Sequence, residues 1–484
     1  MDRREMIRDA GMAAAAAMLV RPGKQTYAQE AEAVKSRVNT NSQPSKLMIT
    51  DMRVVNVMNR WIIRLDTNQG LSGYGEVRDG SSPTYALMLK SRILGMNPCN
   101  VEKIFKKLKQ FGNNGRQAGG VVSIEMACWD LAGKAWGVPC WQMLGGKYRD
   151  KIRVYADTPS DPDPAVMGKK LKQRIDMGFT FLKMDVSINL LKDVKGGVTY
   201  PAGAEPFGKI RKAVKGAQPA KEKAEERNST DDFAFVKHPF TGIRITDKGL
   251  RHIKNYVAAV REIIGWEIPL ATDHYGHFAI EDGIKLAQAL DEFNLAWLED
   301  MVPWQYTDQY VRLRNSCKTP ILTGEDIYLK EGFRDLFDKK AISICHPDLA
   351  TAGGLLETKR IGDLAMENGI AMVLHMAGNP VTLFSTVHCA AATENFLVME
   401  HHNVESDWYN NIVTGVPKPI MGKDGFIPVP DGPGLGFVFN EDAVKAMLKD
   451  PSKEYFPPTP EWNNERSWDR DWSIGPSQSA NRPA

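Results

Sequence analysis

The chain has 484 residues, 43% of them hydrophobic and 25% charged, so it can bury large cores and is long enough for two domains plus additions. Its formal net charge is only +3, and no run of Lys and Arg is interleaved with aromatic residues in a nucleic-acid-binding pattern. A nucleic-acid-binding or scaffold role is therefore disfavoured, and we expect no nucleic-acid partner.

The amino terminus has the pattern of an export signal. Arg3 and Arg4 precede a modest apolar segment at 10–20, and the residues up to Ala28 resemble a small-residue cleavage site. This predicts a twin-arginine signal peptide over residues 1–28 and a periplasmic protein. A frayed alanine-rich helix, with a cytoplasmic protein, is the alternative. The apolar segment is too short to span a bilayer comfortably, so we expect no membrane span in the mature protein.

Residues 45–150 are predicted to form an α+β domain. The runs 61–66 and 71–76 alternate between apolar and polar residues as strands do, and helical stretches follow to about residue 145.

Two loops of this region are polar and contain glycine, as mobile substrate-contacting loops must. They span 76–82 and 111–117. Arg78 and Arg116 within them are candidate contacts for a substrate carboxylate or hydroxyl groups. Ordinary solvated arginines are an equally good interpretation.

Short apolar runs alternate with amphipathic stretches over residues 151–425, which predicts consecutive β/α units of a TIM-like barrel. In the run 181–185, strand periodicity points both Lys183 and Asp185 into the barrel mouth. An internal ion pair between these two side chains is the alternative. The polar stretch 187–245 interrupts the barrel and is interpreted as a lid or a subunit contact, with a disordered loop as the alternative.

Three carboxylates follow at equal spacing, each at the end of a short apolar run: Asp273, Glu299 and Glu325. In a parallel barrel, the carboxyl ends of adjacent strands converge on one face, where three oxygen donors suit a hard cation such as Mg²⁺. Three unrelated acidic strand ends are the alternative, which the regular spacing weakens. We predict one divalent-metal site.

The next strand ends carry a matched aspartate and histidine. Asp348 and His375 are separated by one further barrel unit, and a carboxylate beside an imidazole fixes its tautomer and suits it to general-base catalysis. A structural histidine is the alternative. One strand later come Glu400, His401 and His402. A protonated Glu400 could donate to a developing oxyanion, and His401 is a candidate substrate contact.

These residues resemble the enolase superfamily, specifically its mandelate racemase/muconate lactonizing enzyme-like members. The segment 120–146 is similar to the helix and turn that lead from the capping domain into the barrel. Residues 431–436 resemble the return to that domain, which would include residues 426–484. The resemblance covers about residues 45–450. It implies a modified TIM barrel of (β/α)7β type with an α+β capping domain built from both ends of the chain.

The resemblance also implies a half-reaction, in which Mg²⁺ chelates a substrate carboxylate and a base removes the proton from the adjacent carbon to give an enediolate. One ion per site is expected, and Mn²⁺ is expected to substitute. By motif position, the metal ligands are Asp273, Glu299 and Glu325. The base is His375, and its orienting partner is Asp348.

The second barrel strand departs from the family pattern of Lys-x-Lys, because Asp185 stands where many relatives have the second lysine. Lys183 resembles the first lysine, which is often a substrate-carboxylate contact or a modulator of its neighbour's pKa, and it is a candidate catalytic residue. Asp185 is a candidate substrate contact. Because the second lysine is the opposite-face base in those relatives, its absence disfavours a two-base racemase. Tyr275, two residues after the first metal ligand, is a candidate general acid.

With one clear base and several proton donors, dehydration of a sugar acid to a 2-keto-3-deoxy acid is the leading prediction. A racemase, epimerase or cycloisomerase acting through the same enediolate is the first alternative. A non-catalytic sugar-acid-binding protein is the second. The expected partner is a small sugar acid whose stereochemistry the sequence does not specify. A homo-oligomer is expected because it is common among the proteins that the chain resembles.

Overall fold

The computed structural model describes residues 42–201, 242–273, 276, 278–402, 404 and 406–466. The signal peptide predicted over 1–28, residues 202–241 of the predicted insertion, and Tyr275 lie outside the described residues. Among the residues that are described, helices long and apolar enough to cross a membrane are absent.

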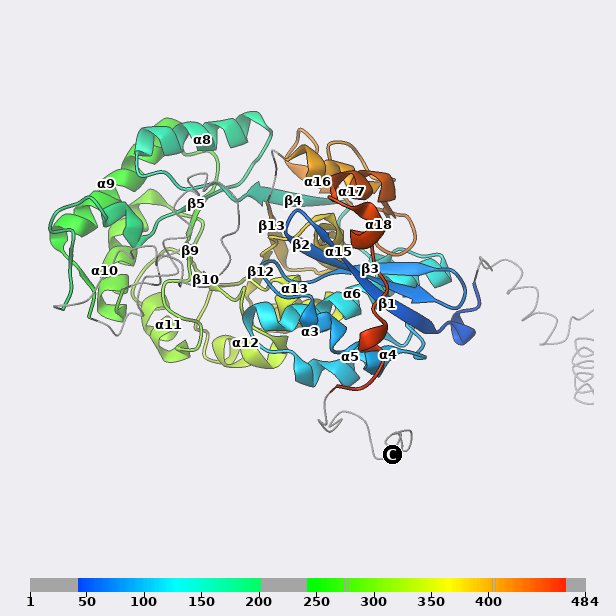
Figure 1. Ribbon diagram of the computed structural model, residues 1–484. Coiled ribbons are helices and arrows are strands. Elements are labelled where there is room, and N and C mark those ends of the chain that lie inside the picture. The colour runs from blue at the N-terminus through cyan, green and yellow to red at the C-terminus, as the bar shows by residue number, and fades with distance from the viewer. Residues whose placement is uncertain are drawn as a thin grey trace, which may run out of the picture. The chain divides into compact units, whose positions relative to one another are not determined.

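Eight parallel strands form a barrel with helical connections. The strands are β4 (Lys151–Ala156), β5 (Leu182–Asp185), β8 (Leu270–Asp273), β9 (Leu298–Glu299), β10 (Ile321–Thr323), β11 (Ile344–Cys345), β12 (Ala371–Leu374) and β13 (Phe396–His401). The connecting helices are α8 (Pro164–Asp176), α9 (Asp247–Ile264), α10 (Ile280–Leu290), α11 (Thr307–Arg314), α12 (Leu329–Asp338), α13 (Leu349–Ala352), α14 (Leu355–Glu367) and α15 (Pro380–Ala392). β13 also pairs with β4, which closes the barrel, and the helices lie outside the strands (Figure 1). The predicted (β/α)7β barrel is confirmed.

A layer of buried side chains, one from each strand or from the residue before it, fills the barrel interior. This layer consists of Tyr155, Phe181, Ala271, Trp297, Leu322, Ile344, Val373 and Val398. Because side chains alternate along a strand, the residue two positions later should face inward as well, one layer nearer the carboxyl ends. Those positions are Asp157, Lys183, Asp273, Glu299, Gly324, His346, His375 and Glu400. The apolar layer thus places a polar layer at the mouth of the barrel.

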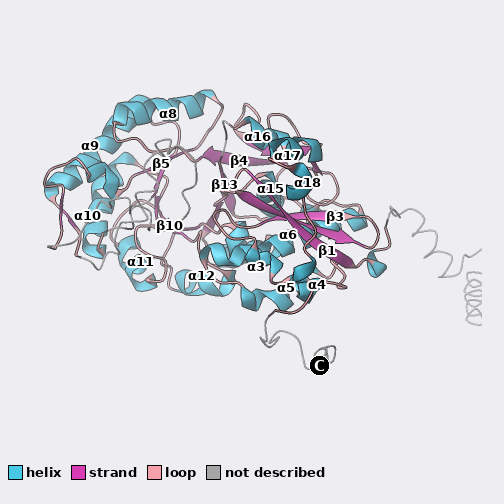
Figure 2. Cartoon of the chain, viewed as in Figure 1, coloured by secondary structure: helices cyan, strands magenta, loops and turns pink. Residues whose placement is uncertain are grey.

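The capping region begins with an antiparallel sheet of β1 (Ile49–Val57), β2 (Arg60–Thr67) and β3 (Ser72–Glu76), drawn in magenta in Figure 2. The helices that follow are α3 (Thr84–Leu87), α4 (Lys90–Ile93), α5 (Val101–Leu108), α6 (Gly119–Trp136) and α7 (Cys140–Met143). α6 is buried along most of its length and packs on β3. The glycines of β3 permit this approach, since a Cβ at Gly75 would lie 1.8 Å from the carbonyl oxygen of Ser123.

The carboxyl-terminal segment comprises α16 (Asp407–Asn411), β14 (Val413–Thr414), β15 (Phe426–Pro428), β16 (Val438–Phe439), α17 (Glu441–Met447) and α18 (Pro451–Glu454). β15 pairs antiparallel with β4 of the barrel, and the later part of the segment packs on the sheet of β1, β2 and β3. Tyr74 of β3 stacks on Phe439 with ring centroids 4.6 Å apart. The buried ammonium of Lys90 donates to the carbonyl oxygen of Thr459 at 3.0 Å. The two ends of the chain therefore build one capping region.

Two buried carboxylates join the capping region to barrel helices. Glu125 of α6 accepts hydrogen bonds from the backbone N–H groups of Leu355 (3.0 Å) and Leu356 (3.3 Å), where α14 begins. Glu76 at the end of β3 accepts from the N–H groups of Asn379 (2.9 Å) and Thr382 (3.3 Å), where α15 begins. The first N–H groups of a helix have no partner within the helix. Each carboxylate therefore accepts hydrogen bonds from buried donors that would otherwise lack an acceptor.

We expect Glu125→Gln to remove part of the pH dependence of stability. Burial raises the pKa of Glu125 to about 8 from its usual value near 4.5. The folded protein therefore holds this proton more tightly than the unfolded chain. The stabilising contribution is complete below about pH 4.5 and is lost as pH rises toward 8.

Urea unfolding of both proteins at pH 5 and pH 8 measures this effect. The wild type should lose more unfolding free energy between the two pH values than Glu125→Gln does, because glutamine has no proton to release. Equal losses would show that Glu125 does not titrate in this window.

Candidate active site

Acidic side chains gather at the carboxyl ends of adjacent barrel strands. Asp273 ends β8, Glu299 ends β9, and Asp300 follows it. Potential ligand atoms of these three side chains all lie within 4.8 Å of one another, and the same holds for Glu299, Glu325 and His346. Glu299 belongs to both groups and therefore links the three predicted metal ligands into one cluster.

Glu325 enters this cluster through a local break in strand alternation. Gly324, directly before it, has φ of 141°, a conformation that side-chain-bearing residues rarely adopt. A Cβ on Gly324 would also lie 2.6 Å from the ring of Phe333. The glycine turns the backbone so that Glu325 points at the site, with Oε2 3.2 Å from Nε2 of His375.

Acidic side chains outnumber basic ones in this cluster. Burial and the charges of Glu325, Glu299 and Asp273 raise the pKa of Asp300 well above its usual value. Oε1 of Glu299 is buried, and its contact with Nδ1 of His346 at 2.8 Å lacks hydrogen-bond geometry. Oxygen donors in excess, one of them not hydrogen-bonded, fit a hard divalent cation such as Mg²⁺.

Lys183 partly neutralises the cluster. Its Nζ lies 2.8 Å from Oδ2 of Asp273, 2.9 Å from Oε1 of Glu400 and 3.6 Å from Oε2 of Glu299. Burial alone would lower the pKa of Lys183, but these carboxylates raise it well above its usual value. Lys183 is thus a charged hydrogen-bond donor. Asp185 is buried on the same strand, opposite Asp273 in the pairing of β5 with β8.

The predicted imidazole and carboxylate dyad is formed. Nδ1 of His375 lies 2.5 Å from Oδ2 of Asp348, and the two residues form an isolated parallel bridge beyond β11 and β12. Nε2 of His375 therefore faces the acidic cluster. Burial alone would lower the pKa of His375, but the charges of Glu325 and Glu400 and the Asp348 hydrogen bond raise it to about 10. These charges favour the imidazolium, the form that the ring takes when it holds a proton removed from a substrate.

Arg78 reaches the dyad from the capping region. It is 2% exposed, its Nη1 lies 3.3 Å from Oδ2 of Asp348, and its Nε donates to Oγ1 of Thr351 at 2.9 Å. Arg78 also forms ion pairs with Asp79 and, through Nη2 at 3.9 Å, with Glu325. The structure therefore corrects the reading of Arg78 as an ordinary solvated arginine, because the side chain is buried beside Asp348. Its role as a substrate contact stays a prediction. Although burial opposes ionisation, Arg78 and His375 hold the pKa of Asp348 below its usual value.

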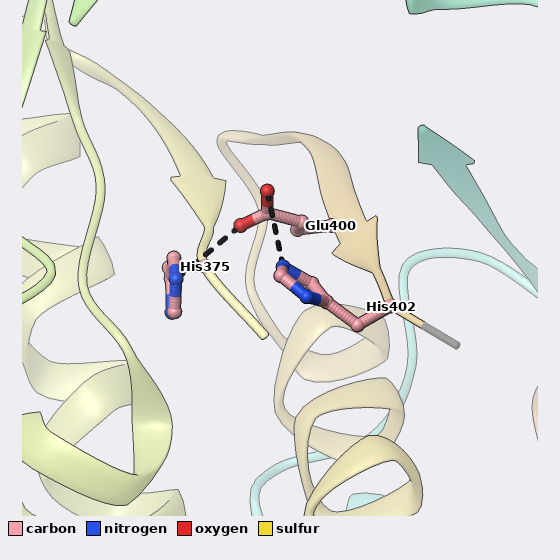
Figure 3. A group of neighbouring side chains, drawn as sticks. All are labelled: His375, Glu400 and His402. Atoms are coloured by element: carbon pink, nitrogen blue, oxygen red, sulfur yellow. Dashed lines mark ion pairs between the residues drawn. The ribbon is translucent and has the colours of Figure 1, made fainter. Parts of the chain in front are cut away.

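Glu400 lies between two histidine rings, as Figure 3 shows. Its Oε2 is 3.5 Å from Nε2 of His375, and its Oε1 is 3.5 Å from Nε2 of His402. Although burial would raise the pKa of Glu400, Lys183 and the two imidazoles lower it well below its usual value. This corrects the expectation of a protonated Glu400, because three cationic partners favour the carboxylate. The nearby ammonium also disfavours a metal ion between these histidines.

His401 is not brought into this group. It lies on the opposite face of β13 from Glu400, and its ring centroid is 5.4 Å from that of Tyr409. Burial lowers the pKa of His401 to about 3, so it is a neutral packing residue.

A cavity of about 330 Å³ adjoins the cluster. Its lining residues are Gly276, Asp300, Val302, Pro303, Trp304, Gln305, Thr323, Glu325 and Asp326. Arg116, the second predicted substrate contact, is 3.4 Å from Asp326 and 3.3 Å from Asp79 through its guanidinium nitrogens. It is half exposed, and so it stands at the edge of the site next to the cavity.

Three site residues were not assigned from the sequence. His346 has Nδ1 2.8 Å from Oε1 of Glu299 and Nε2 3.3 Å from the hydroxyl of Tyr155. Asp300 accepts a hydrogen bond from Oγ1 of Thr323 at 2.6 Å. His402 is the third. Counting every second residue from the apolar layer would have found His346 and His402, whereas Asp300 has φ of 48° and follows no strand pattern.

Comparisons with known proteins agree with this arrangement. Residues 166–443 match the model of the enolase C-terminal domain-like family, and residues 30–145 match that of the mandelate racemase/muconate lactonizing enzyme N-terminal domain. A protein of Haloferax volcanii named D-xylonate dehydratase is 29% identical, covering 83% of this chain and 89% of its own length. A protein of Agrobacterium fabrum named D-galactarolactone cycloisomerase is 24% identical, with 79% and 89% covered.

Among solved structures, a mandelate racemase/muconate lactonizing enzyme-like protein from Rubrobacter xylanophilus superposes with a TM-score of 0.68. It is 27% identical, and the match covers 83% of this chain and 98% of that one. The similarity therefore extends over both the barrel and the capping region.

Proposed function

Because the chain belongs to the mandelate racemase/muconate lactonizing enzyme family of the enolase superfamily, we propose that it is a sugar-acid dehydratase, a hydro-lyase acting on an aldonic or aldaric acid. The observation that carries this proposal is the dyad of His375 and Asp348, which turns Nε2 of the imidazole toward the acidic cluster. The dehydratase named among its relatives supports the choice of reaction.

In this reaction, His375 removes the proton from C2 of the substrate through Nε2. Asp348 holds the ring by Nδ1 and stabilises the imidazolium that results, and Arg78 fixes Asp348 in turn. Lys183 donates hydrogen bonds where negative charge develops on the substrate carboxylate. The C3 hydroxyl then leaves as water, and the enol tautomerises to a 2-keto-3-deoxy acid.

Asp273, Glu299 and Glu325 would hold Mg²⁺. When bound there, the ion supplies positive charge that stabilises the doubly charged enediolate and acidifies the C2 proton. The cavity next to Glu325 has room for the remainder of a sugar acid, and its polar lining from Asp300 and Asp326 suits hydroxyl groups.

Isomerisation through the same enediolate is the second candidate, favoured by the similarity to a protein named as a cycloisomerase. Such a reaction needs the same removal of the C2 proton but no loss of water. The two candidates therefore share His375 and differ in what happens at C3.

The test is to incubate the purified protein and Mg²⁺ with a library of aldonic and aldaric acids and to assay 2-keto-3-deoxy products. The proposal expects such a product from at least one acid. If no acid gives a keto product while one exchanges its C2 hydrogen with D₂O, dehydration is wrong and isomerisation takes its place.

A further inference from the structure

The active site contains a second imidazole whose Nδ1 faces a carboxylate, at a longer distance than Nδ1 of His375 does. Nδ1 of His402 lies 3.7 Å from Oδ2 of Asp157, and Nε2 lies 3.5 Å from Oε1 of Glu400. His375 likewise turns Nδ1 to a carboxylate and Nε2 toward Glu400. Two carboxylate and imidazole pairs thus flank one glutamate, with the ring centroids of the histidines 6.1 Å apart.

Barrel geometry accounts for this symmetry. Asp157 follows β4, and His402 follows β13, and these two strands pair in the closed barrel. His402 stands two residues after Glu400, which places both on the inward side of the strand. The second pair therefore comes from the strands on the far side of Glu400 from His375.

Two atoms between the rings lack a protein partner. Nε2 of His402 and Oε2 of Glu400 are both buried, and neither has a hydrogen-bond partner among the described residues. At 3.5 Å, Nε2 of His402 is too far from Glu400 for a well-formed hydrogen bond. Leaving a buried donor without a partner is costly, so these atoms indicate where a polar group of the substrate binds.

The charges around His402 favour its protonated form. Burial and the neighbouring His375 act against the imidazolium, while Asp157 and Glu400 outweigh them and raise the pKa of His402. Lys183 is also close to Glu400, but its ammonium is held between Glu400 and Asp273. Nε2 of His402 is thus a proton donor without a hydrogen-bonded acceptor in the part of the chain that the structure describes.

Resting on the proposed dehydration, we propose that His402 is the general acid that protonates the leaving C3 hydroxyl. His375 takes the C2 proton as the C2–H bond breaks, and the electron pair forms the enediolate. As the C2–C3 double bond forms, the C3–O bond breaks and its oxygen takes the proton from Nε2 of His402, leaving as water. His375 ends protonated and His402 neutral, so the two imidazoles exchange their starting states with no net change in protons.

Three variants test this assignment with the acid that the wild type dehydrates fastest. His402→Asn should lower kcat for dehydration by about 100-fold or more, the usual contribution of a general acid. It should still exchange the C2 hydrogen with D₂O, because His375 is intact. His375→Asn should lose both reactions. His252→Asn, the same change on the outer helix α9, controls for loss of a histidine elsewhere.

A substrate analogue with fluorine at C3 distinguishes loss of a general acid from structural damage to the site. Fluoride leaves without protonation, so His402→Asn should release it at close to the wild-type rate. If the variant loses fluoride release and C2 exchange to the same degree as dehydration, or if it dehydrates like the wild type, the assignment is overturned. A wild type that exchanges C2 but never releases water would instead overturn the proposed dehydration.

Asp157→Asn provides a second line of support that does not remove the imidazole. Loss of the aspartate charge should lower the pKa of His402. A general acid must be protonated to act, so the alkaline limb of the kcat profile should move to lower pH. An unchanged alkaline limb would contradict the pairing of Asp157 with a catalytic His402.

Discussion

Replacing His375 with asparagine is expected to abolish turnover, lowering kcat by at least about 100-fold and more where proton removal limits the rate. Asparagine is a polar residue of similar size, but its side chain cannot accept the C2 proton. Among the described residues, Glu400 is a poor substitute base because its pKa is held low, and Asp348 is committed to Arg78 and Thr351. Product formation and C2 deuterium exchange should both disappear.

The control for His375→Asn is cation binding. Of the three predicted metal ligands, Glu325 contacts His375, at 3.2 Å. The variant keeps all three carboxylates, so a Mg²⁺ titration should give nearly the wild-type affinity. A variant that binds Mg²⁺ normally and still exchanges the C2 hydrogen at the wild-type rate would show that another residue is the base.

Glu299→Gln is expected to have the second large effect, a loss of Mg²⁺ affinity of more than about 100-fold, since even outer partners of a metal ligand contribute 10- to 100-fold. Glu299 is fully buried and is shared by both acidic groups. Its Oε2 accepts from Nε1 of Trp297 at 3.0 Å, and its Oε1 lies 2.8 Å from Nδ1 of His346 without hydrogen-bond geometry. The amide keeps the shape but removes the charge and one strong oxygen donor.

Calorimetric titration with Mg²⁺ measures this loss without relying on activity. Glu281→Gln, the same change on the exposed face of α10, is the matched control and should bind Mg²⁺ like the wild type. If Glu299→Gln binds Mg²⁺ with unchanged affinity, the cation does not sit between β8 and β9, and the assignment of the acidic cluster is wrong.

The acidic cluster and the dyad were predictable because each of their residues ends a short apolar run. In a parallel barrel all such ends meet on one face, so position along the chain translates directly into position in space. Asp273, Glu299 and Glu325 meet for this reason, and so do Asp348 and His375. The barrel itself was predictable on the same grounds, from the regular alternation of strands and helices.

His346 and His402 were missed although the sequence contained the signal. Both stand at even spacing from the apolar layer of the barrel, two residues after Ile344 and four after Val398. This layer can be recognised only when the register between all eight strands is known. The sequence of a single strand does not give that register. Glu325 departs from the same rule by one residue, because Gly324 turns the backbone.

The contacts between the capping region and the barrel could not be predicted from the sequence. Arg78 meets Asp348, and Glu76 meets Asn379, across some 300 residues of chain, and no local pattern encodes such pairs. The arginine was therefore read as a loop contact for substrate. The signal peptide over 1–28, the role of Tyr275 and the homo-oligomer stay predictions.

The most direct test of the account follows the C2 hydrogen itself. A substrate carrying deuterium at C2 is converted in H₂O, and the deuterium is traced by NMR in the solvent and at C3 of the product. The account predicts that the wild type releases the deuterium to solvent with a primary isotope effect, and that His375→Asn releases none. Deuterium retained at C3 in every turnover, or released equally by the variant, would contradict proton removal by His375.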